Sequence, residues 1–293
     1  MWGVNLAAGV PRTARLVIVI AMAAAFMALP YGASAATGGD PVPACDAATP
    51  DITGAGVIVG TAAKEIIFGS PGKDFITGGG GGDLICGFDG GDVIHAVGTF
   101  VTVSGGPGDD IIAVEGFVAS VYGGPGDDTI TMEGSGPFAR GGDGDDDIDL
   151  GEGDFPYAIG DGGNDRIRIG DGPWPGAEGG DGRDTIRIGD GFMPFADGGD
   201  GPDTIRVGDG SGAFVKGGRG DDHITAGDST VGYPGEPHRA NFLVGEDGND
   251  ILKGGGDNDI LDGGADRDIC IGRGGVDVAI RCEVSPNIEH SIP

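Results

Sequence analysis

The sequence predicts an all-β protein in which short parallel strands stack as a solenoid. A nine-residue unit, Gly-Gly-x-Gly-x-Asp-x-(Ile/Leu)-x, recurs along most of the chain, and residues 123–131 (GGPGDDTIT) show it in full. A short fixed period indicates a solenoid, because one unit cannot bury its own apolar face and must stack on its neighbours. Isoleucine recurs every 18 or 19 residues, and the low aromatic content of 6% argues against a large globular core.

Each unit is expected to consist of a turn followed by a short strand. Glycine at positions one, two and four allows positive φ angles, so the carbonyl groups of the turn can point towards a common centre, where aspartate at position six adds a carboxylate. The middle residue of the last three is expected to face inwards and its neighbours outwards. Two units make one coil of about 18 residues, and about twelve coils at strand spacing make a rod of roughly 55–60 Å.

The spacing of isoleucine predicts one continuous column of inward side chains. These β-branched residues suit a buried parallel sheet, where both faces of the strands are covered. The column consists of Ile112, Ile130, Ile148, Ile167, Ile186, Ile205 and Ile224.

The units resemble the RTX, or haemolysin-type, calcium-binding repeat family over roughly residues 60–281. The resemblance implies a right-handed parallel β-roll, a form of β-helix solenoid, with Ca²⁺ held between the turns of successive coils. Carbonyl and carboxylate oxygens suit Ca²⁺ better than Zn²⁺ or copper. The resemblance implies a metal-binding role for the aspartate at position six of fourteen units: Asp74, Asp83, Asp92, Asp110, Asp128, Asp146, Asp165, Asp184, Asp203, Asp222, Asp250, Asp259, Asp268 and Asp277.

Alternate units are expected to lie on opposite sides of the coil. On one side the spacing gives an unbroken series from Asp74 to Asp222, which residues 230–239 interrupt and which Asp259 and Asp277 are expected to resume. The other side keeps the motif only near its ends. Its aspartates are expected to be Asp83, Asp250 and Asp268. We therefore expect calcium sites mainly along one edge, on the order of ten ions in all.

The charge of the chain limits its partners and its folding. It has 47 acidic and 17 basic residues, which gives a net charge of −30. Such a charge excludes nucleic acid as a partner and makes the compact state repel itself. We therefore expect folding to be coupled to calcium. The alternative is a disordered acidic segment, which is the state expected without calcium.

The N-terminus has the features of a secretory signal peptide, residues 1–35. Arg12 and Arg15 precede an apolar run over 16–29, and Ala33-Ser34-Ala35 supplies a cleavage site. An uncleaved anchor is the alternative, and no other stretch could cross a bilayer. The remaining chain is divided into an N-terminal cap at 36–59, the β-roll at 60–281 and a C-terminal cap or tail at 282–293. The protein is expected to be secreted and monomeric.

The four cysteines indicate two disulfides in an exported chain. Three pairings are possible. Cys45–Cys86 with Cys270–Cys282 is favoured, because each bridge then pins a terminal segment at one end of the solenoid, where strand edges are unpaired. A zinc site is the alternative, but the sequence lacks a C-x-x-C motif.

Two further patterns lie outside the repeat consensus. Arg168, Arg187 and Arg206 are expected to stack outwards, with acidic residues three or four positions later, either as charge balance on a solvated face or as an anion site. The aromatic residues either pack on one another or form a contact surface for a glycan or a protein. Most of them fall in the half-coils that lack the motif: Phe100, Phe117, Phe138, Phe155, Tyr157, Trp174, Phe192, Phe195 and Phe214.

No catalytic motif accompanies the repeats. The sequence contains neither H-E-x-x-H nor G-x-S-x-G, so no enzymatic activity is predicted. The function expected is a secreted calcium-binding structural, surface or adhesion module. The alternatives are a binding module for a glycan, ice or a protein, and a lytic or hydrolytic protein.

Overall fold

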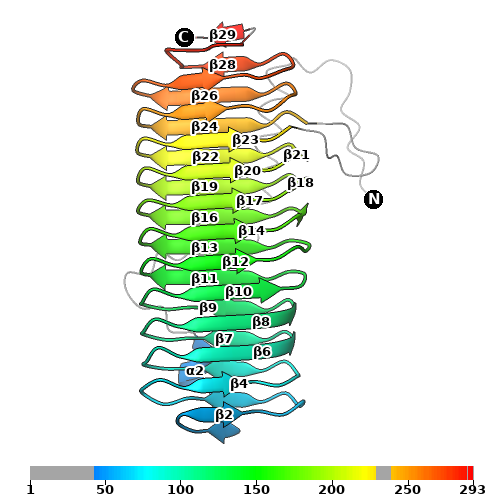
Figure 1. Cartoon of the computed structure of the whole chain (residues 1–293), viewed down its shortest axis with the longest axis vertical. Helices are drawn as coiled ribbons and strands as arrows, with labels where there is room; N and C mark the ends of the chain where they lie inside the picture. The colour runs from blue at the N-terminus through cyan, green and yellow to red at the C-terminus, as the bar shows by residue number, and fades with distance from the viewer. Residues whose placement is uncertain (1–42, 229–238, 289, 293) are drawn as a thin grey trace. The chain divides into compact units, whose positions relative to one another are not determined.

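The computed structural model describes residues 43–228, 239–288 and 290–292. Within them the chain winds into about twelve coils whose strands pair in parallel with the strands of the coils above and below (Figure 1). This confirms the predicted all-β solenoid. The predicted signal peptide, 1–35, lies outside the described residues.

Two long parallel sheets form the opposite walls of the stack, and a third, short sheet lines one corner. Sheet A contains β1 (Ile52–Thr53), β3 (Ile66–Phe68), β5 (Leu84–Cys86), β7 (Thr102–Ser104), β9 (Ser120–Tyr122), β11 (Phe138–Asp143), β13 (Tyr157–Gly162), β16 (Gly176–Asp181), β19 (Phe195–Asp200), β22 (Phe214–Arg219), β24 (Phe242–Asp247), β26 (Ile260–Ala265), β28 (Val278–Ile280) and β29 (His290–Ile292).

Sheet B alternates with sheet A along the chain. It contains β2 (Val57–Val59), β4 (Phe75–Thr77), β6 (Val93–Thr99), β8 (Ile111–Phe117), β10 (Thr129–Glu133), β12 (Asp147–Leu150), β14 (Arg166–Ile169), β17 (Thr185–Ile188), β20 (Thr204–Val207), β23 (His223–Ala226), β25 (Ile251–Lys253) and β27 (Ile269–Ile271). Sheet C contains β15 (Gly172–Pro173), β18 (Gly191–Phe192) and β21 (Gly210–Ser211). The helix α2 (Pro43–Ala47) precedes the first strand.

The core is a narrow column between sheets A and B. The predicted isoleucines, Ile112 to Ile224, are paired in register on sheet B and are at most 1% exposed. Sheet B has a second inward position. Its side chain is large where sheet A supplies a small residue to the same coil, and small where sheet A supplies a large one. Met132 accompanies Ala139, whereas Ala226 accompanies Leu243. This compensation keeps the filling of each coil nearly constant, as close packing requires.

One coil is longer than the others, and it changes the predicted phase of the repeats. His223 on β23 pairs with Ile251 on β25, so residues 229–238 are an insertion within a single coil. Asp250, rather than Asp259, therefore continues the series that ends at Asp222. The expectation that Asp259 and Asp277 resume this series was wrong, because an insertion of ten residues moves the nine-residue pattern by about one half-coil.

The two predicted disulfides are both present, but only one closes an end of the solenoid. Cys270 occupies an inward core position on β27, the last strand of sheet B, and its bridge to Cys282 brings residue Val284 alongside that strand. Cys45 on α2 is instead bonded to Cys86 on β5, the third strand of sheet A. The N-terminal bridge thus fastens α2 to the flank of the stack.

The paired strands extend into both predicted cap segments. β1 and β2 lie before residue 60, and β29 lies after residue 281. Among the described residues, no helix has the length and apolar character needed to span a bilayer.

Candidate metal-binding ladders

Aspartates stack in register along one edge of the coils, immediately before the strands of sheet B. We call this series the main ladder. In each step the backbone N–H of one aspartate donates to Oδ1 of the aspartate one coil further on, at distances from 2.6 Å (Asp92 to Asp110) to 2.9 Å (Asp222 to Asp250). The ladder consists of Asp74, Asp92, Asp110, Asp128, Asp146, Asp165, Asp184, Asp203, Asp222, Asp250 and Asp268.

The same interaction is continued at the last rung by a residue outside the consensus. The backbone N–H of Asp268 donates to Oε2 of Glu283, in the segment held by the C-terminal disulfide. Sequence reasoning missed Glu283 because no glycine-rich turn precedes it. Its longer side chain reaches the position that aspartate occupies in the regular coils.

The second ladder, on the opposite edge, has acidic or amide residues only near its ends. Glu65 and Asp83 form the N-terminal part, where the Glu65 N–H donates to Asp83 Oδ1 at 2.9 Å. At the other end the order is Asn241, Asp259 and Asp277. The prediction that this edge keeps the motif only near its ends is confirmed, but its C-terminal members are Asp259 and Asp277 instead of Asp250 and Asp268.

Between these ends, the ladder position holds residues without a carboxylate. Four successive coils place proline there, and proline has no backbone N–H to be satisfied. The replacement is therefore compatible with the absence of a carboxylate in the next coil. The residues in register are Val101, Ala119, Pro137, Pro156, Pro175, Pro194 and Ala213.

The second carboxylate oxygen, Oδ2, is buried without a hydrogen-bond partner along nearly the whole main ladder. These aspartates are at most 2% exposed. A buried acceptor of this kind is costly unless a cation or a proton satisfies it. The orphaned atoms are Oδ2 of Asp92, Asp110, Asp128, Asp146, Asp165, Asp184, Asp203, Asp222, Asp250 and Asp268 and, in the second ladder, of Asp83.

The glycine at position one leaves a small space into which Oδ2 points. A Cβ added to Gly105 would lie 2.0 Å from Asp110 Oδ2 and 2.8 Å from the carbonyl oxygen of Gly123 in the next coil. Two oxygens from adjacent coils therefore face the same point. Gly160 repeats the arrangement, with Asp165 Oδ2 at 2.1 Å and the carbonyl oxygen of Gly179 at 2.5 Å. The space exists only because position one lacks a side chain.

Burial opposes ionisation of these aspartates. Desolvation raises the pKa of Asp128 and of Asp146 to about 8, although in each case a backbone N–H of the preceding coil lowers it. Neighbouring carboxylates raise it further. The pKa of Asp110, Asp165 and Asp203 is raised to about 7 by the same causes. A bound cation would reverse this balance by favouring the charged form.

Three acidic side chains differ from the other ladder residues, because nearby N–H or hydroxyl groups of the protein donate hydrogen bonds to their second carboxylate oxygen. The backbone N–H and the hydroxyl of Ser70 donate to Asp74 Oδ2, at 2.6 and 3.0 Å. The N–H of Gly255 donates to Asp259 Oδ2 at 2.7 Å, and the N–H of Thr61 donates to Glu65 Oε2 at 2.6 Å. These three positions have less need of a cation than the rest.

Asn241 shows how the ladder accommodates an uncharged residue. Its Oδ1 accepts the N–H of Ala213 at 3.1 Å, which is the interaction that Asp Oδ1 makes elsewhere. Its Nδ2 donates to the carbonyl oxygen of Gly227 at 3.4 Å. The amide therefore places a donor towards a carbonyl, where a carboxylate would place a second acceptor.

The donor set fits a hard cation held largely by backbone oxygens. No group of three or more His, Cys, Asp or Glu side chains converges on one point within the described residues. Each space instead offers a carboxylate oxygen and carbonyl oxygens from adjacent turns. Oxygen ligands in flexible arrangements are those that Ca²⁺ accepts, whereas Zn²⁺ prefers nitrogen and sulfur.

The aromatic half-coils pack mainly on themselves. Phe195, Phe214 and Phe242 form a stacked series on sheet A, with ring centroids 6.1 and 5.5 Å apart. At one corner the rings of Phe155 and Trp174 stack at 5.0 Å. The interpretation that these residues cover one another is confirmed for these pairs.

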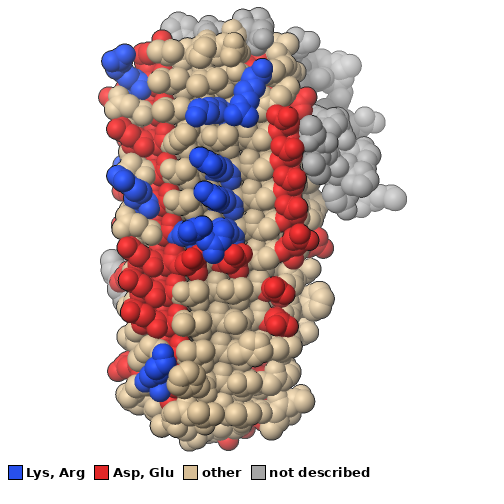
Figure 2. Space-filling view, in the orientation of Figure 1, with Lys and Arg blue, Asp and Glu red and all other residues tan. Residues whose placement is uncertain are grey.

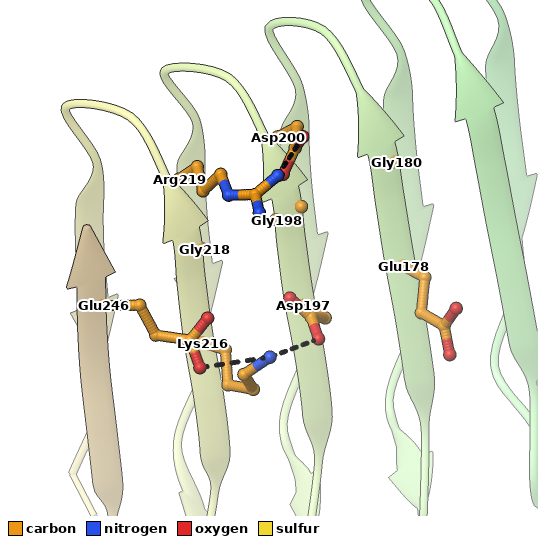
Figure 3. A pocket seen from close by; sticks show the side chains of 10 residues that line it. Glu178, Gly180, Asp197, Gly198, Asp200, Lys216, Gly218, Arg219 and Glu246 are labelled. Atoms are coloured by element: carbon orange, nitrogen blue, oxygen red, sulfur yellow. Dashed lines mark hydrogen bonds and ion pairs between the residues drawn. The ribbon is translucent and has the colours of Figure 1, made fainter. Parts of the chain in front are cut away.

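A shallow depression on the outer face of sheet A has its lysine and arginine already paired. Figure 3 shows Lys216 between Asp197, at 3.0 Å, and Glu246, at 3.3 Å. Arg219 is paired with Asp200 at 2.9 Å. The floor is formed by glycines of adjacent strands, including Gly180 and Gly218. Neither cation is therefore available to a ligand without breaking an existing ion pair.

Comparison with known proteins supports the repeat assignment. A family model described as RTX calcium-binding nonapeptide repeat (4 copies) matches residues 59–94, 87–116, 120–131, 213–230 and 239–279. No curated protein is similar enough to the chain to count as a match. The coils between about 131 and 213, where the second ladder carries proline, fall outside these matches. The matched segments on either side of these unmatched coils therefore consist of RTX calcium-binding nonapeptide repeats.

Proposed function

We propose that this calcium-binding module is a secreted protein in which the aspartate ladders hold Ca²⁺ and make folding dependent on it. The folded solenoid then acts as a rigid structural or surface module. The observation that carries the proposal is the series of buried, unpartnered Oδ2 atoms, most of which face a carbonyl oxygen of the next coil. Bound Ca²⁺ would supply the positive charge that these oxygens require.

The fourteen aspartates of the consensus are the proposed ligands, but they are not equivalent. Those with an orphaned Oδ2 are proposed as the principal sites. Asp74 and Asp259 are proposed as weak sites, because Ser70 and Gly255 already donate to them. Asp277, which accepts the N–H of Asp259 at 2.9 Å, is proposed to close the second ladder.

Secretion is supported by two independent features. Residues 1–35 have the pattern of a signal peptide, and the two disulfides are typical of an oxidising compartment. Calcium would then be met only after export, so the acidic chain could be exported unfolded and would fold outside the cell. Adhesion or a surface role is proposed because a rod stiffened by calcium is suited to spacing and display.

A second role, as a binding module for a glycan or a protein, is favoured by an exposed aromatic corner. Phe100, Phe117 and Phe155 are 68%, 59% and 57% exposed. Phe100 and Phe155 also have φ angles of 61° and 57°, which bulky residues adopt rarely. This corner adjoins the central part of the second ladder, where carboxylates are absent, and lies away from the main ladder, so such a role is compatible with calcium binding there.

The metal content of the secreted protein tests the proposal. We expect on the order of ten calcium ions per chain, with little replacement by Mg²⁺, which demands a stricter geometry. Asp128→Ala should remove about one or two ions, because the carboxylate contacts adjacent coils. Asp74→Ala serves as the matched control and should change the content less. A wild-type protein without stoichiometric calcium would refute the proposal, and equal losses in the two variants would refute the ranking of sites.

A further inference from the structure

The outer face of sheet B carries a row of cationic side chains in successive coils. Arg168, Arg187 and Arg206 are in register on β14, β17 and β20, and the column continues through Thr225 to Lys253. We call these residues, with His223 beside them on β23, the basic row. Figure 2 shows basic side chains along the middle of this face, with acidic side chains in columns on both sides.

Two members of the basic row have no counter-charge among the residues that the structure describes. Arg168 is paired with Asp147 and Asp149, each at 2.9 Å. Lys216 and Arg219, on the other sheet, are also paired with carboxylates. Arg187 and Arg206 are exposed and make no hydrogen bond or ion pair with any described residue, although the chain has 47 acidic residues. The remaining end of the row is a contact between Lys253 Nζ and His223 Nε2 at 2.8 Å.

The row of like charges does not stabilise the folded state. Residues in register on neighbouring strands lie about 4.8 Å apart, and like charges directly opposite one another are destabilising. The lowered pKa of His223, which follows from burial and then from the charges of Lys253 and Arg206, reports the same local excess of positive charge. A ligand that brings anions to the row would relieve this repulsion.

The neighbouring side chains limit the width of such a ligand. Along one side Asp171, Asp190, Asp209 and Asp228 form a column of their own, in which each of the last three donates its backbone N–H to Oδ1 of the one before. On the sheet itself Thr185 and Thr204 lie two residues before the arginines and add hydroxyl groups. The positive region is therefore about one side chain wide. It suits a single file of anions and would repel a broad polyanion such as an anionic membrane or a DNA duplex.

We propose that the basic row binds a linear anionic polysaccharide that lies along the stack of coils. Its successive sulfate or carboxylate groups would pair with Arg187 and Arg206, whose planar guanidinium groups can each donate two hydrogen bonds to such an anion. Thr185, Thr204 and Thr225 would hydrogen-bond to the sugar hydroxyls, and Lys253 would extend the row. Arg187 and Arg206 lie on the neighbouring strands β17 and β20, so the fold fixes the spacing between them.

Binding of defined polymers to the calcium-loaded full-length protein tests this proposal. The probes are dextran sulfate and hyaluronan, which carry sulfate and carboxylate groups, with neutral dextran and duplex DNA for comparison. The Arg187→Gln/Arg206→Gln variant should bind the preferred anionic polymer about tenfold or more weakly, with a shallower dependence on salt. The Arg183→Gln/Arg267→Gln variant loses the same charge from exposed turns and should bind like the wild type.

The outcomes separate this proposal from calcium binding. The calcium content should be the same in the wild type and in both variants. Equal calcium content would show that the solenoid of each variant is intact. A wild type that binds neither anionic polymer, an equal loss in the two variants, or binding of neutral dextran or duplex DNA as tight as that of the anionic polymer would each overturn the proposal. None of these results would affect the assignment of the aspartate ladders.

Discussion

The Asp128→Asn/Asp146→Asn/Asp165→Asn variant is expected to lose about three calcium ions and yet to be more stable than the wild type in EDTA. Asparagine keeps an oxygen that accepts the N–H of the preceding coil, as Asp128 Oδ1 does at 2.8 Å. Its amide nitrogen replaces the orphaned Oδ2 and can donate to the carbonyl oxygen of the next coil. Three buried negative charges also disappear. In EDTA at pH 8, where the wild type is expected to be largely disordered, the variant should therefore show the larger strand signal in circular dichroism.

The structure contains an amide at one ladder position, although its acceptor carbonyl precedes it in the chain instead of lying in the next coil. Asn241 accepts the N–H of Ala213 and donates to the carbonyl oxygen of Gly227. The matched control is alanine at the same three positions, which removes the acceptor as well as the charge. It should lose the same ions but gain less stability in EDTA, because three buried N–H groups are left unsatisfied. An asparagine variant that keeps its full calcium content would contradict the assignment of these aspartates.

Acidification is expected to order the calcium-free protein. From Asp110 to Asp250, the aspartates of the main ladder have their pKa raised from 3.8 to between about 6 and 8, chiefly by desolvation. The folded state therefore binds more protons than the unfolded state between about pH 4 and pH 8, so its stability rises as the pH falls through this window. Above pH 8 the carboxylates are charged in both states, and the compact form has its lowest stability without calcium.

This dependence can be followed by the far-ultraviolet circular dichroism of the protein in EDTA from pH 9 to pH 5. The strand signal should increase as the pH falls, and the asparagine variant should show a smaller change because three of the titrating groups are absent. With saturating calcium the signal should vary little between pH 7 and pH 9. A calcium-free protein whose order decreases from pH 8 to pH 5 would contradict the structural explanation.

The regular part of the fold could be predicted because each element has a local cause. Glycine at fixed positions sets the turn, and one inward isoleucine per coil sets the register. The column from Ile112 to Ile224 is buried as predicted. Aspartate at position six is equally constrained, because the strand that follows it begins at the next residue, as β4 begins at Phe75 after Asp74.

The nine-residue period alone does not show which aspartates continue each ladder after the insertion. Asp250, Asp259, Asp268 and Asp277 are nine residues apart, so either alternate pair could follow Asp222. Only the pairing of β23 with β25 decides between them. The pairing depends on long-range packing, which the nine-residue pattern does not contain.

The residues that replace aspartate were missed for a different reason. Asn241 and Glu283 accept the N–H of the preceding coil as aspartate does, and Glu65 donates its own N–H to Asp83, but the motif does not include these three residues. A signal was present for the central part of the second ladder: Pro137, Pro156, Pro175 and Pro194 recur every 19 residues. Because proline lacks an N–H, this spacing marks the coils where the carboxylate ladder is absent.

The central claim is that calcium bound along the ladders allows a strongly acidic chain to form the solenoid. Circular dichroism of the purified mature protein at pH 8, first in EDTA and then during titration with calcium, tests it most directly. The account predicts a largely disordered spectrum in EDTA and a cooperative gain of strand signal upon addition of calcium, complete when on the order of ten ions are bound. A strand signal already complete in EDTA and unchanged by calcium would contradict it.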